Sequence, residues 1–306
     1  MTIDPDRGRF VVCAGKYEVI ATGSEPSFFI FSCMIESRMH KMISLNNGLH
    51  MPRLGLGVYK TPSQQTQQVV SLALDTGYRL IDTAVFYKNE VGVGNAIRHS
   101  GIPREDIFVT TKLFPTRFFG VEEAFERSLD RLGLEYIDLY LIHFPFFCKK
   151  FVWKVLEKIT ASGRVKSIGV SNFSIKDLEQ ISKDVVITPA VNQVEFHPFL
   201  YRKELLDYCS QKGIVLEAHS PLTHGYRLQD TRISAVAQHY QKTNGQLLIR
   251  WSLQHGLVVI PKTTRLERLK ENINVFDFEI THEDMMVLDA LNENDQILKR
   301  SFFGRI

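Results

Sequence analysis

From residue 42 onward the sequence alternates between short apolar runs and longer amphipathic stretches, and this alternation strongly constrains the fold. The short runs have the length of buried strands, and the stretches between them have the spacing of helices. The expected strands are 53–58, 80–82, 107–112, 137–143, 165–170, 191–195, 215–219 and 257–260, and the expected helices are 64–76, 89–100, 121–132, 153–161, 175–182, 203–212, 233–240, 246–254, 266–274 and 281–291. Strands that alternate with helices favour a parallel sheet in an α/β fold.

Eight strand–helix units without a linker between them favour a closed (β/α)8 TIM barrel. An open doubly wound sheet is the alternative. A hairpin is expected before the first unit, at residues 43–52, because Asn47-Gly48 is a strong signal of a two-residue turn. We expect this N-terminal β-hairpin to close the bottom of the barrel and helix 281–291 to be an extra C-terminal helix.

Residues 1–41 show no clear period and are expected to form an irregular N-terminal extension, with the barrel domain at 42–306. Acidic residues on the N-terminal side of the apolar run 28–35 argue against a signal peptide and against a transit peptide. Three alternatives stay open: a disordered extension, a segment absent from the mature protein, or a segment packed on the domain. Later start codons stand at Met34, Met39 and Met42.

The composition excludes several classes of protein. Apolar residues make up 44% and charged residues 23% of the 306 residues, as in ordinary globular proteins. The net charge of +3 is too small to predict a nucleic-acid or membrane partner. No apolar run approaches the roughly 20 residues that span a bilayer. The 4 cysteines are far apart, with no metal-ligand spacing, so we expect reduced thiols, a cytoplasmic location and no metal site.

Polar residues occur where most of the expected strands end, and in a barrel the C-terminal strand ends surround the site of chemistry. These residues are Asp82, Lys112, His143, Ser171, Asn172, Gln193, His219, Ser220, Lys262 and Thr263, with Tyr87 shortly after Asp82. Each has a structural alternative, such as Asp82 as a helix cap or His143 as a core histidine. Their accumulation at one rim is harder to explain by packing and predicts a functional site.

The residue types at this rim suit proton transfer to a carbonyl group. A carboxylate at Asp82 would hold Lys112 charged, and a charged lysine would lower the pKa of Tyr87 from its usual value of about 10. Tyr87 could then act as a general acid near neutral pH, while a neutral His143 imidazole orients and polarises the carbonyl oxygen. Because no side chain supplies a hydride, a cofactor is implied.

The segments 82–87, 134–143, 169–173, 191–195 and 260–272 carry long motifs in a characteristic order. Through them the chain from Met42 to the C-terminus resembles the aldo-keto reductases, in particular their compact, short-loop members. The resemblance implies a catalytic tetrad of Asp82, Tyr87, Lys112 and His143, with Tyr87 as the proton donor. It also implies NADPH/NADP+ as the cofactor.

The resemblance further implies a role for each expected cofactor residue. Ser171, Asn172 and Gln193 would bind the nicotinamide carboxamide. Lys262, Thr263 and Arg268 would bind the adenosine 2′-phosphate, which suits NADPH over NADH. The remaining expected cofactor residues are His219, Ser220, Leu222, Glu271 and Asn272.

Some positions depart from the family pattern. His219 stands where the family usually has a tyrosine or tryptophan stacked on the nicotinamide, and its ring offers a smaller face. Phe144 replaces a tryptophan. We expect Phe144, Phe302 and Phe303 to form walls of the substrate pocket.

The resulting prediction is NADPH-dependent reduction of aldehydes and ketones by a monomer. Because the loops are short, small aldehydes, α-dicarbonyls or diketo acids are the expected substrates, and a prostaglandin-like substrate remains a candidate. The alternative is an NADPH-binding sensor with little turnover, a hypothesis motivated by His219 and by the unusual N-terminal segment.

Overall fold

The computed structural model describes residues 2–4, 9–14, 17–21, 41–114, 120–183 and 185–297. The chain falls into two compact units, Met1–Met42 and Ile43–Ile306. In the first unit, the antiparallel strands β1 (Thr2–Asp4), β2 (Arg9–Ala14) and β3 (Tyr17–Ala21) form a sheet in the order β1-β2-β3. These strands were not expected from the sequence. Whether this unit belongs to the mature protein stays a prediction.

The second unit contains an 8-stranded sheet whose strands are neighbours in sequence order. The strands are β6 (Leu56–Gly57), β7 (Leu80–Asp82), β8 (Phe108–Leu113), β9 (Ile137–Ile142), β10 (Val165–Ser171), β11 (Val191–Glu195), β12 (Val215–His219) and β13 (Val258–Val259). All seven neighbouring pairs are parallel. Backbone bonds from Gly55 N to Val259 O (2.9 Å) and from Val259 N to Arg53 O (2.8 Å) join the segment directly before β6 to the last strand, β13. The expected (β/α)8 barrel is therefore confirmed.

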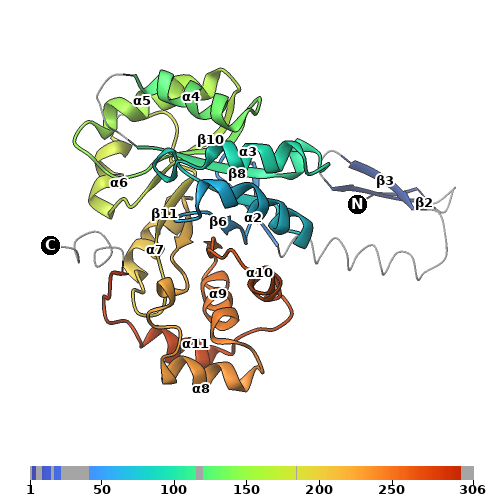
Figure 1. Ribbon diagram of the computed structural model, residues 1–306, viewed down its shortest axis with the longest axis vertical. Helices are drawn as coiled ribbons and strands as arrows, with labels where there is room; N and C mark the ends of the chain where they lie inside the picture. The colour runs from blue at the N-terminus through green and yellow to red at the C-terminus, as the bar shows by residue number, and fades with distance from the viewer. Residues whose placement is uncertain are drawn as a thin grey trace. The chain divides into compact units, whose positions relative to one another are not determined.

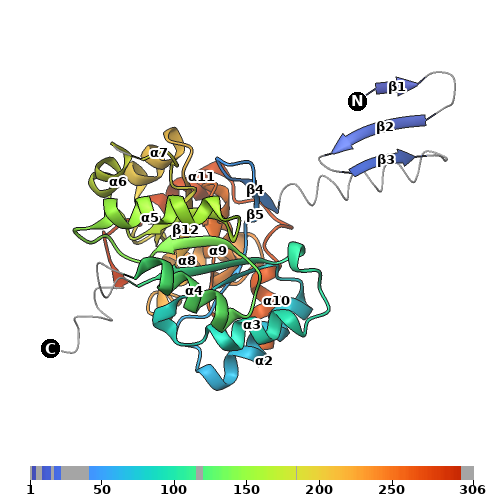
Figure 2. The same cartoon turned by 90° about the horizontal axis from the view of Figure 1, so that it is seen from above.

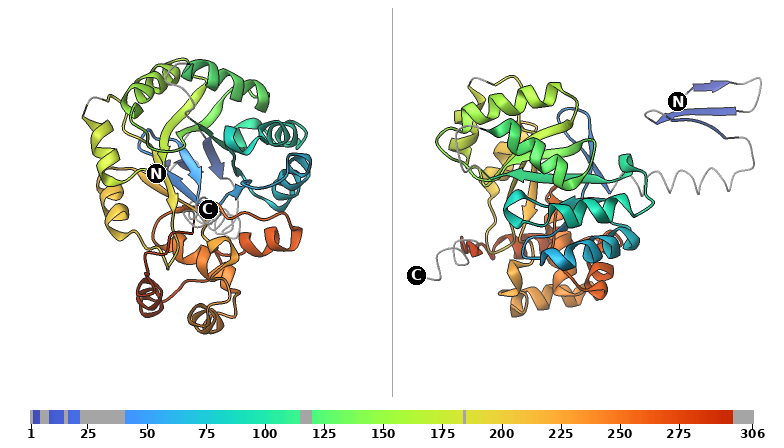
Figure 3. Two further views of the ribbon diagram at one scale, coloured as in Figure 1. Left: turned by 60° about the vertical axis from the view of Figure 1, so that its left-hand side comes forward. Right: turned by 45° about the horizontal axis from the view of Figure 1, so that its top comes forward.

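The helices surround the strands, as Figure 3 shows in its left view. They are α2 (Ser63–Thr76), α3 (Glu90–Arg98), α4 (Val121–Leu132), α5 (Lys149–Ala161), α6 (Ile175–Ser182), α7 (Lys203–Gln211), α8 (Thr231–His239), α9 (Asn244–Gln254), α10 (Leu266–Ile273) and α11 (His282–Asp289) (Figure 1). Short 3-10 turns are η1 (Val85–Tyr87), η2 (Arg104–Asp106) and η3 (Thr223–Gly225). Helix α11 is the expected extra helix. Within the described ranges, no helix is long and apolar enough to cross a membrane.

Local sequence chemistry explains several helix boundaries. Ser174 begins α6 with a capping box, in which its hydroxyl accepts a hydrogen bond from Asp177 N and the Asp177 carboxylate accepts one from Ser174 N. Gly77 ends α2 with φ of 105°, a conformation that glycine adopts without strain. Helix α5 begins at Lys149, earlier than expected. The sequence did not predict this start, because a lysine pair at the beginning of a helix carries no apolar period and opposes the helix dipole.

The hairpin of β4 (Met42–Ser44) and β5 (His50–Pro52) closes the N-terminal end of the barrel, as expected (Figure 2). Asn46 Nδ2 donates to Pro189 O at 3.0 Å, and Asn47 Nδ2 donates to Lys166 O at 3.0 Å, next to the starts of β11 and β10. The turn itself differs from the expected two-residue form. Gly48 N donates to Leu45 O, and Gly48 follows the turn in the left-handed region with φ of 83°.

Candidate active site

A cavity of about 730 Å³ lies at the C-terminal ends of the barrel strands, which is a typical size for a ligand site. Its walls include most of the residues singled out from the sequence: Asp82, Tyr87, His143, Phe144, Ser171, Asn172, Gln193, His219, Ser220, Leu222, Lys262, Thr263, Arg268, Glu271 and Asn272. Lys112 is fully buried next to this wall. Phe302 and Phe303 lie outside the described residues, so their place in the pocket stays a prediction.

Lys112 and Asp82 form a buried ion pair between the neighbouring strands β8 and β7. Lys112 Nζ donates to both Asp82 oxygens at 2.7 Å and to the Thr83 carbonyl at 2.9 Å. Burial raises the pKa of Asp82, and the charge and hydrogen bonds of Lys112 oppose that shift. Removing either partner would leave the other charge buried without compensation.

Tyr87 follows β7 on the 3-10 turn η1, which side-chain hydrogen bonds hold in place. Thr83 Oγ1 donates to Asn89 Oδ1 at 2.7 Å, and Asn89 Nδ2 donates to Val58 O at 3.0 Å. The turn brings the Tyr87 hydroxyl to 3.4 Å from Lys112 Nζ. Asp82, Lys112 and Tyr87, which were expected to act together, therefore lie within hydrogen-bonding contact of the same ammonium group.

The expected lowering of the Tyr87 pKa is wrong for this cavity. Burial raises the pKa of Tyr87 well above its ordinary value, and the charges of Asp82, Tyr59 and Glu217 raise it further. The physical reason is that burial outweighs the attraction of the Lys112 ammonium, whose charge is partly balanced by Asp82. Tyr87 therefore keeps its proton at neutral pH, which is the state that a proton donor requires.

His143 directly follows β9 and lies edge-on to Tyr87, with the ring centroids 5.7 Å apart. The ring of His143 also stacks on Phe144, with the centroids 4.8 Å apart. Burial, with the nearby charges of Lys112 and His219, lowers the pKa of His143 well below its usual value, so the imidazole is neutral. Its Nδ1 has no hydrogen-bond partner in the described part of the chain.

A second polar group lies on β10 and β11. Asn172 Nδ2 donates to the His143 carbonyl and to Ser171 Oγ, both at 3.0 Å. Ser171 Oγ in turn donates to the Gln193 carbonyl at 3.0 Å. Asn172 adopts the left-handed conformation, with φ of 63°, which asparagine tolerates better than most residues.

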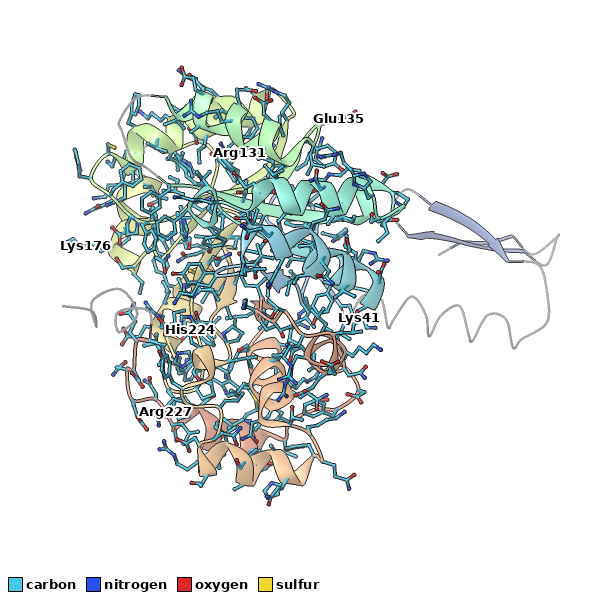
Figure 4. All side chains as sticks on the ribbon, viewed as in Figure 1. Lys41, Arg131, Glu135, Lys176, His224 and Arg227 are labelled. Atoms are coloured by element: carbon cyan, nitrogen blue, oxygen red, sulfur yellow. The ribbon has the colours of Figure 1, made fainter. Side chains whose placement is uncertain are left out.

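His219 is held by hydrogen bonds at both of its ring nitrogens. Because the Asn172 amino group donates elsewhere, its Oδ1 must be the atom that lies 3.1 Å from His219 Nε2, so Nε2 carries the proton. His219 Nδ1 then accepts from Ser220 Oγ at 3.0 Å, and Ser220 Oγ lies 2.8 Å from His224 Nε2. The side chain of His224 is labelled in Figure 4. A tyrosine or tryptophan side chain has a single polar atom and could not make both of the hydrogen bonds of His219, which gives a physical role to the departure at this position.

His219 should make the protein less stable in acid. Burial lowers the pKa of His219 to about 3, whereas histidine in an unfolded chain titrates near 6.5. Because the folded-state pKa is depressed, the stability falls as pH drops below about 6.5, by about 2 kcal/mol at pH 5. Urea unfolding of the wild type and of His219→Gln at about pH 7 and pH 5 measures this term. Equal losses of stability in the two proteins would contradict it.

Sequence reasoning missed Glu217, a fully buried carboxyl in the middle of β12. Gln193 Nε2 donates both to Glu217 Oε2 at 2.7 Å and to Asp82 Oδ2 at 2.8 Å. The signal was present in the sequence, because an acidic residue inside a strand of a parallel barrel has no solvent to face.

A basic group also lines the cavity. Lys262 and Thr263 follow β13, and Arg268 on α10 contacts both carboxylate oxygens of Glu271, at 2.8 and 2.6 Å. Burial lowers the pKa of Lys262, and the charge of Lys60 lowers it further. Lys60 was not among the expected residues, although it closely follows the first expected strand. Clustered cations of this kind favour an anionic ligand such as a phosphate.

A profile described as "Aldo/keto reductase family" matches residues 52–293. The chain belongs to the aldo/keto reductase family. The resemblance inferred from the motifs is thereby confirmed, and the family membership makes the protein an oxidoreductase that acts on carbonyl groups.

Several relatives are similar over nearly their whole length. The glyoxal reductase of Bacillus subtilis (strain 168) is 47% identical over 260 residues, which cover 83% of this chain and 94% of the relative. The 9,11-endoperoxide prostaglandin H2 reductase of Trypanosoma cruzi (strain CL Brener) is 46% identical over 267 residues, covering 84% and 94%. A solved aldo/keto reductase from Brucella melitensis has a TM-score of 0.79 at 42% identity, covering 82% of this chain and 99% of that chain. The sensor alternative gains no support from these relatives.

The lining of the cavity fits the nicotinamide cofactors that this family uses. Gln193 and Ser171 offer hydrogen-bonding groups in the same cavity as the neutral His143. Lys262 and Arg268 offer positive charge for a phosphate. The donor set therefore suits a ligand that carries both an amide and an anionic group.

Proposed function

We propose that this protein reduces aldehydes and ketones to alcohols with NADPH and that Tyr87 donates the proton. The observation that carries the proposal is the Tyr87 hydroxyl, 3.4 Å from the ammonium of a buried Lys112–Asp82 pair and next to the neutral ring of His143. A phenol that keeps its proton and an imidazole without charge suit a carbonyl oxygen that gains negative charge during the reaction.

Each residue has a distinct task in this proposal. His143 donates a hydrogen bond that orients the carbonyl oxygen toward Tyr87. Tyr87 gives its proton to that oxygen, and Lys112 stabilises the phenolate that remains. Asp82 fixes the position of Lys112 through two hydrogen bonds of 2.7 Å. The bound cofactor supplies the hydride.

The cofactor would be held along the length of the cavity. Ser171, Asn172 and Gln193 would surround the carboxamide, with His219, Ser220 and Leu222 beside the nicotinamide. Lys262, Thr263 and Arg268 would bind the 2′-phosphate, with Glu271 and Asn272 near the adenine. The hydrogen bonds of the Asn172 amide leave it rigid, so this part of the cavity is organised before the cofactor binds.

The substrate side of the cavity has aromatic walls. Phe86 stacks on Phe114 at 4.9 Å, and Phe144 stacks on His143 at 4.8 Å. Such walls suit the carbon skeleton of a small aldehyde or α-dicarbonyl, and the similarity to a glyoxal reductase supports that class. The similarity to a prostaglandin H2 reductase supports a prostaglandin-like substrate as the second candidate.

The basic residues Lys262 and Arg268 of the cavity should set the preference for NADPH over NADH. In a Lys262→Ala/Arg268→Ala variant, loss of charge-assisted hydrogen bonds to the 2′-phosphate should raise KM for NADPH by about 10- to 100-fold. KM for NADH should change by less than about threefold, since NADH has no such phosphate. The matched control is Lys242→Ala, whose ammonium binds Asp277 at 2.6 Å outside the cavity. A similar rise of KM for both cofactors would contradict the assignment.

A panel of aldehydes, ketones and α-dicarbonyls tests the proposed function directly. Turnover is followed by the loss of reduced-nicotinamide absorbance with the full chain and with a chain that starts at Met42. We expect multiple turnovers with NADPH for both chains. Absence of turnover with every carbonyl, while NADPH still binds, would instead favour the sensor hypothesis. A cytosolic location and a monomeric state, with no nucleic-acid or membrane partner, stay predictions.

A further inference from the structure

Glu217 occupies an unusual position for a carboxyl group. It lies at the centre of β12, opposite Gln193 of β11 and Val258 of β13, with no exposed surface. Its Oε2 accepts a hydrogen bond of 2.7 Å from Gln193, and its Oε1 has no hydrogen-bond partner among the described residues. A buried carboxyl with so few partners costs stability, so packing alone does not explain it.

Glu217 fixes the orientation of the Gln193 amide. The two N–H groups of Gln193 are directed to Glu217 Oε2 and to Asp82 Oδ2, which lie 2.7 and 2.8 Å from Nε2. Gln193 also lines the cavity, so the side-chain polar atom that it has left for a ligand is the acceptor Oε1. Without Glu217, one of the two bonds that prevent the amide from rotating would be lost.

The ionisable groups that interact with Glu217 come from three other elements of the barrel. They are Asp82 on β7, Tyr87 on η1 and Lys112 on β8. The histidines that line the same cavity, His143 and His219, are neutral, because burial lowers the pKa of each. Lys112 already balances Asp82, to which it donates two bonds. A second buried carboxylate would be unbalanced, so burial and the charge of Asp82 raise the pKa of Glu217 to about 8.

We infer that Glu217 is a positioning residue for this reaction. It fixes the Gln193 amide for the cofactor, and its ionisation in alkaline solution holds the proton on Tyr87. This inference rests on the proposed function. Alcohol oxidation requires the Tyr87 phenolate to take the hydroxyl proton while the hydride on the alcohol carbon passes to NADP+. Aldehyde reduction requires the protonated phenol. An ionised Glu217 therefore favours reduction over oxidation.

The sign of the effect follows from the charges. A negative charge on Glu217 raises the pKa of Tyr87, because it disfavours the negative charge of the phenolate. Replacing Glu217 with a neutral side chain removes this charge. The phenolate then forms at a lower pH, and alcohol oxidation rises at a lower pH.

Two variants of Glu217 separate its two effects. Glu217→Gln keeps an acceptor for Gln193, and the midpoint of the pH profile of kcat for benzyl alcohol oxidation should fall by on the order of one pH unit. Glu217→Leu should show the same shift and also raise KM for NADPH by about fivefold, because Gln193 loses a hydrogen bond. An unchanged midpoint in Glu217→Gln, or an unchanged KM in Glu217→Leu, would overturn the inference.

The matched control is Glu90→Gln. In the wild type, the buried Glu90 carboxylate accepts hydrogen bonds from Thr111 Oγ1 at 2.7 Å and from Arg131 Nε at 2.6 Å, outside the cavity. The stability of this variant should fall without any shift of the pH midpoint. A shift equal to that of Glu217→Gln would assign the effect to the loss of any buried carboxylate, which overturns a specific role for Glu217.

A measurement on the unmodified protein covers the case in which the variants do not fold. Infrared difference spectra between about pH 7 and about pH 9 should show the loss of a buried, protonated carboxyl group, since the pKa of Glu217 is raised to about 8. Absence of this change would overturn the inference. The spectra do not depend on turnover, so a protein without reductase activity that still shows the change would contradict the proposed function alone.

Discussion

Tyr87→Phe should lower kcat for aldehyde reduction by about 10²- to 10⁴-fold, the usual contribution of a general acid. The phenylalanine ring keeps the packing against Tyr59, at a centroid distance of 5.0 Å, and against His143, but it has no proton to donate. The Lys112–Asp82 pair remains intact, because Lys112 makes its shorter bonds to Asp82 and Thr83. The dissociation constant of NADPH, measured by fluorescence titration, should therefore stay within about twofold of the wild type.

The control for this substitution is Tyr140→Phe. Tyr140 is buried on β9 and packs against Phe125 at 5.3 Å, away from the cavity. Losing its hydroxyl should leave kcat and the NADPH affinity near those of the wild type. Near-normal turnover in Tyr87→Phe would show that another group delivers the proton, and the assignment of the acid would have to be abandoned.

The sequence could predict the barrel and the strand-end residues because both depend on local pattern. Strand bounds such as 80–82 and 191–195 agree with β7 and β11, each of which ends at an acidic residue. Once the strands are parallel, their C-terminal ends must share one rim, which places Asp82 and Lys112 on neighbouring strands. Strands β6 and β13 are shorter than expected. The ladder between them is reduced to short pairings where the barrel closes.

The electrostatics of the site could not be predicted in the same way. The pKa of Tyr87 depends on how Lys112 divides its charge among several partners and on how completely the group is buried, and neither follows from spacing. Glu217 was overlooked because its role depends on Gln193 of the neighbouring strand, which also reaches Asp82. The tautomer of His219 likewise depends on the amide of Asn172, which directly follows a different strand, β10.

Lys112→Met should lower the free energy of unfolding by about 3–5 kcal/mol and should lose most of the turnover. The substitution keeps the apolar stem but leaves Asp82 buried without the ammonium that lies 2.7 Å from each of its oxygens. Among the described residues, Asp82 keeps a hydrogen bond of 2.8 Å from the neutral amide of Gln193, which cannot balance a full charge. Urea unfolding at neutral pH measures the loss of stability.

The double variant Asp82→Asn/Lys112→Met distinguishes stability from catalysis. Removing both charges should restore most of the lost stability, because no uncompensated charge stays buried, but it should not restore turnover. An exposed pair supplies the control: Lys203→Met, which loses an ion pair of 2.6 Å with Asp207 on the surface of α7, should cost less than about 1 kcal/mol. If the double variant recovered turnover together with stability, Lys112 would be a structural residue, and the phenolate of Tyr87 would need another source of stabilisation.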